Sequence, residues 1–356
     1  MANLPRLVGV FALVLALVLV VAAAIPLLAS PGGDANPRPQ NPASFQPANI
    51  VPQDLGQNGS VSIDAGSDEK VVLIDRAHDN DFEREEIEPM VDALVAQGYE
   101  VRFHGGGGPG GAPRSAGPGS SSPLNSSLRD ADAFVVISPD RPFTDAAQRG
   151  IADFAERGGR VALLGEPTSP SPAITSIFGP APRSTATSQM TPLSSRFGMS
   201  LSTGYLYNMY ENGNNFQNVY ATASGDGPLT AGVDRVLFDR ATEVAVGGDA
   251  SVAVSATDRT ALSTTRQQGR YPVAAVNDNV VLIGDTSFLT PANYQYADNE
   301  VLIGNLAEFL VSGEKEPKPK PTTERPGVPP RPGQPRPPSG GALPTNGSTP
   351  PTPVAP

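Results

Sequence analysis

Short apolar runs alternate with longer amphipathic stretches between about residue 68 and residue 312. Val71–Ile74 is uninterrupted and mostly β-branched, as in strands that are covered on both faces. A helical stretch over about 83–97 follows, and glutamates fill its first turns, where the helix dipole favours negative charge. Tyr99–Phe103 is then predicted as a second strand. This order predicts a strand–helix–strand unit with parallel strands.

The same alternation continues to the end of the region. The further predicted elements are a strand at Ala133–Ser138, a helix from Thr144 to Arg157, strands at Arg160–Leu164, Val273–Val276 and Asn279–Asp285, and a closing helix from Asp298 to Val311. Between residues 181 and 256 the pattern changes to short strands of period two, which predicts a β-rich insertion. We therefore expect one α/β domain at 68–312, with a mostly parallel sheet and helices on both faces.

Both ends of the chain differ from this region. Leu7–Ala29 is uncharged and long enough to cross a hydrocarbon core of about 30 Å, so residues 1–30 are predicted to be a transmembrane anchor, with a cleaved signal as the alternative. Residues 31–67 are predicted to be a flexible stalk, and residues 313–356 a disordered proline-rich tail. The expected location is the cell membrane, with a single pass and the acidic domain outside.

The charge of the chain is uneven. Its net charge is −11, yet residues 54–312 alone carry −15, and Lys70 is their only lysine. An acidic, lysine-poor surface indicates a halophilic protein and argues against nucleic-acid binding. The chain has no cysteine, which removes disulfides and thiolate chemistry. Glycosylation sequons begin at Asn58, Asn125 and Asn346, all in stretches that we expect to be loops.

Polar side chains follow the first two predicted strands. Asp75, His78 and Asn80 come directly after Val71–Ile74, and His104 leaves the second strand. Because the carboxyl ends of parallel strands meet at one sheet edge, where ligands bind, these residues are candidate ligand-binding residues. In the alternative interpretation, Asp75 and His78 only hydrogen-bond the loop backbone and cap the next helix.

Three further residues are predicted to join them. Glu166 and Asp285 each follow a strand and a glycine, and Asn299 begins the closing helix. Asp75, His78, Glu166 and Asp285 are thus the candidate catalytic residues. No ligand pair has metal-site spacing, and no Gly-x-Ser-x-Gly elbow is present, so neither a metal, a cofactor nor a serine triad is expected.

Two other motifs have ordinary explanations. Gly106, Gly108 and Gly111 match a dinucleotide-binding pattern, but prolines and serines follow where a helix should begin. Tyr205, Tyr207 and Tyr210 suit a sugar- or peptide-binding face, although a half-buried hairpin accounts equally well for the first two.

The chain resembles a known family in four places. These are Asp75-x-x-His78-x-Asn80, Arg196-Phe-Gly198, Gly284–Leu289 and Asn299-Glu300. The family is an uncharacterised, membrane-tethered one of archaea and bacteria with a fold like class I glutamine amidotransferases, and similar domains occur in auxiliary subunits of ABC-type and gliding-motility export systems. The resemblance covers roughly residues 68–312 and implies a flavodoxin-like sheet. It brings no established activity, because the amidotransferase nucleophile is a cysteine.

These observations lead to two expectations of function. The first is a non-catalytic module, tethered to the membrane and facing outward, that binds a polar ligand or a protein partner of an envelope or ABC-type export assembly. The second is a hydrolase that uses the strand-end Asp, His and Glu residues as acid, base or metal ligands.

Overall fold

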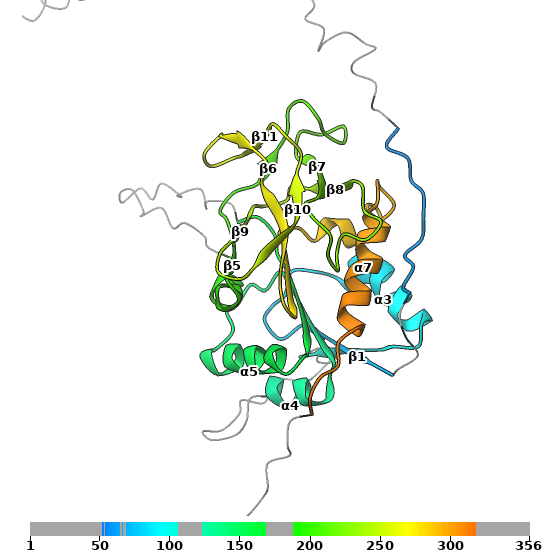
Figure 1. Ribbon diagram of the computed structural model, residues 1–356, viewed down its shortest axis with the longest axis vertical. Helices are drawn as coiled ribbons and strands as arrows, with labels where there is room; N and C mark the ends of the chain where they lie inside the picture. Colours follow the sequence, from blue (N-terminus) through cyan, green and yellow to red (C-terminus); the bar gives the residue numbers. More distant parts are fainter. Residues whose placement is uncertain are drawn as a thin grey trace, which may run out of the picture.

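The computed structural model describes residues 52, 54–64, 66, 69–105, 123–168 and 188–317, which form an α/β domain around a nine-stranded sheet (Figure 1). The order of strands across the sheet is β2-β1-β3-β4-β14-β13-β10-β7-β8. These strands are β1 (Val71–Asp75), β2 (Glu100–His104), β3 (Ala133–Ile137), β4 (Arg160–Leu164), β7 (Asn218–Ala223), β8 (Val236–Asp239), β10 (Ser251–Ala256), β13 (Pro272–Asn277) and β14 (Val280–Ile283).

One half of the sheet is parallel. Strands β2, β1, β3, β4 and β14 pair in parallel, in the order that defines a flavodoxin-like sheet when β14 is counted as the fifth strand. The remaining pairings, from β14 through β13, β10 and β7 to β8, are antiparallel. The predicted parallel sheet is thus present, and it carries most of the candidate residues.

Helices cover both faces of the parallel half, as predicted. The helices are η2 (Arg84–Ile87), α3 (Glu88–Ala96), α4 (Pro123–Asp130), α5 (Asp145–Glu156), α6 (Thr191–Ser194), η3 (Ser195–Phe197), η4 (Ser287–Leu289) and α7 (Asn299–Val311). Val72 and Ile74 of β1 point into a core shared with α3 and α7, whereas Leu73 points into a second core shared with α4 and α5. This alternation explains why the inner strands β1, β3, β4 and β14 are largely apolar, whereas the edge strand β2 keeps exposed polar residues.

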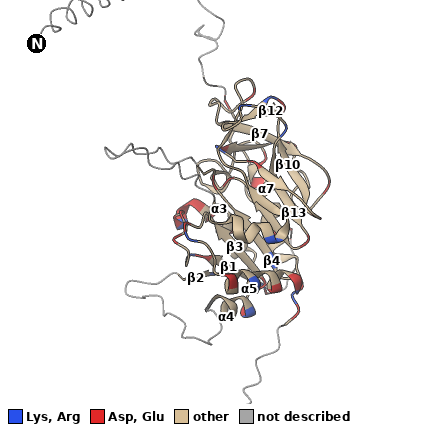
Figure 2. Cartoon of the chain, turned by 90° about the vertical axis from the view of Figure 1, so that its left-hand side faces the viewer, with Lys and Arg blue, Asp and Glu red and all other residues tan. Residues whose placement is uncertain are grey.

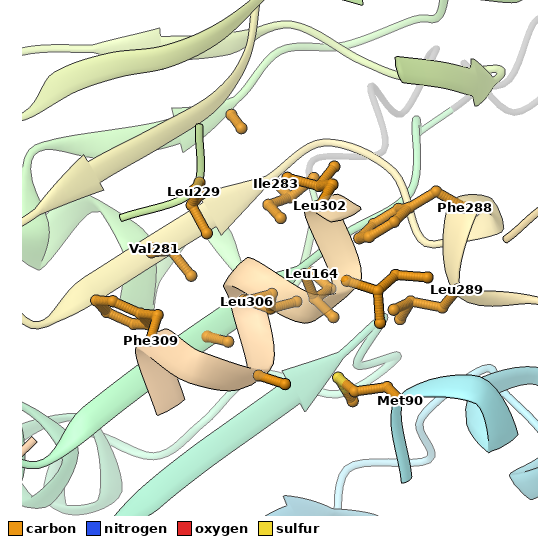
Figure 3. Packing of buried hydrophobic residues seen from close by; sticks show 14 of the residues in the cluster. Met90, Leu164, Leu229, Val281, Ile283, Phe288, Leu289, Leu302, Leu306 and Phe309 are labelled. Carbon is orange, nitrogen blue, oxygen red and sulfur yellow. The ribbon is translucent and has the colours of Figure 1, made fainter. Parts of the chain in front are cut away.

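Helix α7 holds the two strands that end in the candidate acids. Its Leu302 and Leu306 are fully buried and pack against Leu164 of β4 and Ile283 of β14 (Figure 3). Burying one such leucine contributes about 1.5–3 kcal/mol. The ends of β4 and β14 are therefore fixed positions.

Much of the β-rich region continues the main sheet. Strands β7, β8 and β10 extend that sheet, and the described residues form two further small sheets. These contain β5 (Met199–Leu201) with β9 (Val244–Val246), and β6 (Leu206–Tyr207) with β11 (Thr260–Leu262) and β12 (Gln268–Gly269). The prediction of an insertion at 181–256 followed from period-two patterning, which shows the faces of a strand but not its partner.

Part of the predicted stalk lies against the domain. Gln57 bridges to Tyr296, Ile63 joins the core beside α7, and the Asp64 amide donates to Glu308 Oε1 at 2.5 Å. Residues 54–64 are therefore a packed strap. The predicted anchor and most of the tail lie outside the described residues, within which no helix is long and apolar enough to span a bilayer.

Acidic residues dominate the start of α3. Glu85, Glu86 and Glu88 lie in the first turns of η2 and α3, where Figure 2 shows red segments. Glu83 and Glu86 close a capping box, so these charges also satisfy helix-end amides.

Candidate functional site

Asp75 and His78 form a hydrogen-bonded pair at the end of β1. Asp75 is completely buried, and its Oδ2 lies 2.8 Å from His78 Nδ1, while its Oδ1 accepts from the Ala77 amide at 3.3 Å. The His78 ring packs on Phe143 with 3.8 Å between ring centroids. The buried carboxylate thus orients an imidazole that remains 16% exposed.

Asn80 braces the loop that carries His78. Its Oδ1 accepts from the His78 amide at 3.1 Å, and its Nδ2 donates to the Ile137 carbonyl at 2.8 Å. The loop after β1 is thereby tied to the end of β3. The role of Asn80 in ligand binding stays a prediction.

His104 lies beside this pair, as its position on β2 predicts. It is the register partner of Asp75, and its Nδ1 lies 3.2 Å from Ser127 Oγ. Burial lowers the pKa of the His104 imidazole, the Asp75 carboxylate opposes that change, and the charge of His78 adds to it. Both histidines therefore interact with one buried carboxylate.

Glu166 and Asp285 form a second group of candidate residues, a pair of acids at the ends of β4 and β14. Glu166 Oε1 accepts from the Thr286 amide at 2.9 Å and from its hydroxyl, while Asp285 Oδ1 accepts from Ser287 Oγ at 2.8 Å and from the Phe288 amide at 3.2 Å. Burial raises the pKa of both carboxyls, and for Asp285 the neighbouring Glu166 adds to this effect. Asp285 is completely buried, and its Oδ2 has no partner among the described residues.

Ser138 is a site residue that the sequence analysis missed. It directly follows β3 and has a backbone φ of 37°, in the left-handed region that is unfavourable for residues with a Cβ. Its amide donates to the Leu164 carbonyl, and its carbonyl accepts from the Asp81 amide, so both neighbouring strand ends hold it. Its Oγ is buried, with no hydrogen-bond partner in the described part of the chain.

A pocket of about 280 Å³ lies at the same edge of the sheet. The loops after β1, β3 and β4 line it, and two prolines and Gln189 complete its wall. Its main polar residues are Asp81, Ser138, Asp140, Glu166, Thr168 and Ser188. Of the predicted site residues, the structure thus places only Glu166 in the pocket wall. The Asp75, His78 and His104 group and Asp285 lie at the same sheet edge, outside that wall.

Asn299 is not part of the pocket wall, and its role in ligand binding stays a prediction. Its Oδ1 accepts from the Leu237 amide, and its Nδ2 donates to the carbonyls of Leu237 and Asn293. Leu237 lies in β8, at the far edge of the sheet from β2. The amide is used to attach the start of α7 to that edge strand.

The remaining sequence motifs are placed as follows. Asn125 lies in helix α4 rather than in a loop, and Asn58 lies in the packed strap. Asn346 and Gly106, Gly108 and Gly111 lie outside the described residues. Within the described ranges, no group of three or more His, Asp or Glu side chains is arranged to hold a metal ion.

Fold and site together define an α/β domain with a flavodoxin-like parallel half and a polar pocket at its carboxyl edge. The model of the family described as Domain of unknown function (DUF4350) matches residues 116–307, and the chain belongs to this family. No curated protein sequence matches it.

Several solved structures are similar to this chain. The N-terminal domain of mmIFT52 aligns with a TM-score of 0.50 at 10% identity, over 69% of this chain and 99% of that one. A ThuA-like protein from Parabacteroides merdae has a TM-score of 0.41 at 12% identity, over 70% of this chain and 93% of its own. The glutaminase domain of Trypanosoma brucei CTPS with bound acivicin has a TM-score of 0.33 at 9% identity, over 67% of this chain and 93% of its own. At such identities the likeness concerns the fold alone.

Proposed function

We propose that the protein is a binding module and that its ligand, a small polar molecule, occupies the strand-end pocket. The observation that carries this proposal is the position of the pocket beside the point where the strand order reverses, between β1 and β3. Ligands of open α/β sheets bind in this crevice. The carboxylates and hydroxyls of the wall favour a polar ligand.

A larger hollow of about 590 Å³ lies at the opposite edge, between α5 and the β13–β14 turn. Several of its polar groups already make hydrogen bonds within the protein. Arg196 Nε donates to Gln148 Oε1 at 3.0 Å, and the side-chain amides of Asn277 and Asn279 donate to backbone carbonyls. The strand-end pocket instead offers the Ser138 hydroxyl, which has no partner in the described residues.

Blocking the mouth of the pocket tests the proposal. Gln189 is exposed on its rim, so a Gln189→Trp variant should remove the stabilisation that small polar compounds give to the full-length protein in thermal unfolding. Gln267→Trp makes the same change at an exposed position in a remote turn and serves as the control. If both variants keep the full ligand response, the ligand binds elsewhere.

The Asp75–His78 pair favours a second candidate, a hydrolase. A buried carboxylate that holds one imidazole nitrogen leaves the other nitrogen to act as a general base. In that case His78→Asn should abolish hydrolysis of ester or phosphoester substrates, whereas His104→Asn should leave most of it. Hydrolysis that survives His78→Asn would eliminate this candidate.

The location and partner of the protein are further parts of the proposal. We propose that Leu7–Ala29 anchors the chain, that the acidic domain faces outward, and that it serves an envelope or ABC-type export assembly. The uncharged length of that segment and the family resemblance support this. Alkaline extraction of membranes should leave the full chain in the membrane fraction but release a variant without residues 1–30. Protease added to intact cells should cleave the domain.

The proposal that a protein partner binds the strand-end residues has a separate test. An export complex that copurifies with the wild-type chain should be lost in the Asp75→Ala and His78→Ala variants. If it is retained by both variants, the partner binds another surface.

A further inference from the structure

The charges in the wall of the strand-end pocket are of one sign. Asp81, Asp140 and Glu166 contribute carboxyl groups, and Ser138, Thr168 and Ser188 contribute hydroxyls. Among the described residues of the wall, none is basic or aromatic. A ligand there meets hydrogen-bond acceptors and negative charge, without the flat apolar surface on which sugar rings or bases stack.

Glu166 is the acid set deepest in this wall. Thr286 gives both of its hydrogen bonds to Oε1, so no described residue donates to Oε2. Behind Glu166, Asp285 is completely buried and its Oδ2 lacks a described partner. Ser138 Oγ is the second buried atom at this edge that has no described partner. Buried polar atoms normally have partners, so this concentration of exceptions calls for one.

The charged groups around Glu166 leave negative charge in excess. The Thr286 hydrogen bonds and Arg240 favour ionisation of Glu166, Asp239 opposes it, and Glu166 in turn opposes ionisation of Asp285. Burial is the largest effect and raises the pKa of both Glu166 and Asp285. The guanidinium of Arg240 can therefore offset only one of the three carboxyl groups of Glu166, Asp239 and Asp285. A cation bound from solution would offset more of the negative charge.

We propose that this pocket takes a small organic cation with a primary ammonium group, which Glu166 Oε2 and Ser138 Oγ bind. The proposal rests on the function proposed above and adds the class of ligand. An ammonium has three donors and no acceptor, matching a wall of acceptors. A volume of about 280 Å³ is at the small end of ligand pockets and suits a short-chain amine.

Proton release should accompany binding. In the empty pocket the raised pKa keeps a proton on the carboxyl up to a higher pH than usual, and the ammonium binds the ionised form. The proton must leave when the amine enters. Affinity therefore rises with pH, by up to about tenfold per pH unit for each proton released, and levels off above the raised pKa.

Titration calorimetry of the full-length protein with 1,4-diaminobutane and 1,4-butanediol tests the proposal. The two probes have the same length and differ only in charged ammonium against neutral hydroxyl. We expect a dissociation constant of about 1 mM or tighter for the diamine and at least about tenfold weaker binding of the diol. The diamine's affinity should rise as the pH increases above the ordinary glutamate value of 4.5, and the heat should depend on the buffer's ionisation enthalpy.

Glu166→Gln keeps the shape of the side chain but cannot ionise, so it should weaken diamine binding about tenfold or more and remove the pH dependence. Glu156→Gln makes the same change in the hollow at the opposite edge and should bind as the wild type does. Thermal unfolding checks that both variants are folded.

The outcomes separate the two proposals. Diol bound as tightly as the diamine, or diamine bound equally by Glu166→Gln, overturns the cationic ligand but keeps the polar pocket. Calcium that binds while the diamine does not also overturns it. If neither probe binds, and a panel of small polar compounds gives no response that Gln189→Trp removes, both proposals fail.

Discussion

Asp75 and His104 are register partners at the carboxyl ends of β1 and β2, and the Asp75 carboxylate also holds His78 at 2.8 Å. Two imidazoles therefore share one completely buried acid. The arrangement leaves His104 with no acid of its own beyond this shared one, and burial of its ring lowers its pKa below the ordinary 6.5.

The lowered pKa of His104 predicts a loss of stability in acid. The folded state binds fewer protons at this residue than the unfolded state, so stability is lost as the pH falls from about 6.5 toward the folded pKa. A His104→Gln variant cannot take up this proton. Its free energy of unfolding in urea, followed by circular dichroism, should fall less than that of the wild type between about pH 7 and about pH 5. Parallel curves would contradict the assignment.

Asp285→Asn should stabilise the protein at neutral pH. Because the pKa of Asp285 is raised in the folded state, ionisation of this buried acid lowers stability as the pH rises above the ordinary value of 3.8. Asparagine retains an oxygen for Ser287 and Phe288 and carries no charge. Each unit by which the folded pKa exceeds the unfolded one costs about 1.4 kcal/mol of stability at high pH, so we expect a gain of at least about 1 kcal/mol at pH about 8 and less at pH about 5.

The control for this variant is Asp249→Asn at an exposed position, which should leave the free energy of unfolding nearly unchanged. Asp285→Asn that destabilises the protein equally at both pH values would show that the carboxylate has a partner in solution.

Ser138 offers a test of backbone strain. A residue with a Cβ in the left-handed region costs about 1–2 kcal/mol, and glycine avoids this cost. Ser138→Gly should therefore be more stable than Ser138→Ala by about 1 kcal/mol in urea unfolding, although glycine usually weakens a protein. Both variants lack the hydroxyl, so their difference isolates the conformation. Equal stability would mean that the left-handed conformation relaxes in solution.

The parallel half of the sheet was predictable because its inner strands are covered on both faces. Runs such as Val71–Ile74 and Val161–Leu164 are apolar throughout, and a strong helix stop or start adjoins them. Thr144, for example, accepts from the Ala147 amide as the N-cap of α5. Rules based on neighbouring residues suffice to predict elements whose structure is determined by contacts close in the sequence.

The errors arose where distant residues decide. Helix α4 was missed because its Asn125-Ser-Ser segment has low helix propensity, and distant contacts such as the burial of Leu124 and Leu128 stabilise it. The engagement of Asn299 with the backbone of Leu237 was not predicted, because the two residues are 62 positions apart. Ser138 was overlooked because nothing in a Ser-Pro sequence indicates that the serine has a positive φ.

The strap beneath α7 gives a prediction in which the usual rule for helices reverses. Gly304 lies inside α7, where replacing glycine by alanine normally gains about 1 kcal/mol. A Cβ at Gly304, however, would lie 2.3 Å from the Ser62 carbonyl oxygen of the strap. Gly304→Ala should therefore lower the free energy of unfolding of the full chain and expose residues 54–64 to protease. In a chain that begins at residue 65, the same substitution should be neutral or stabilising. A stabilising effect in the full chain would mean that the strap is detached in solution, because only its contact with α7 opposes the helical preference of alanine.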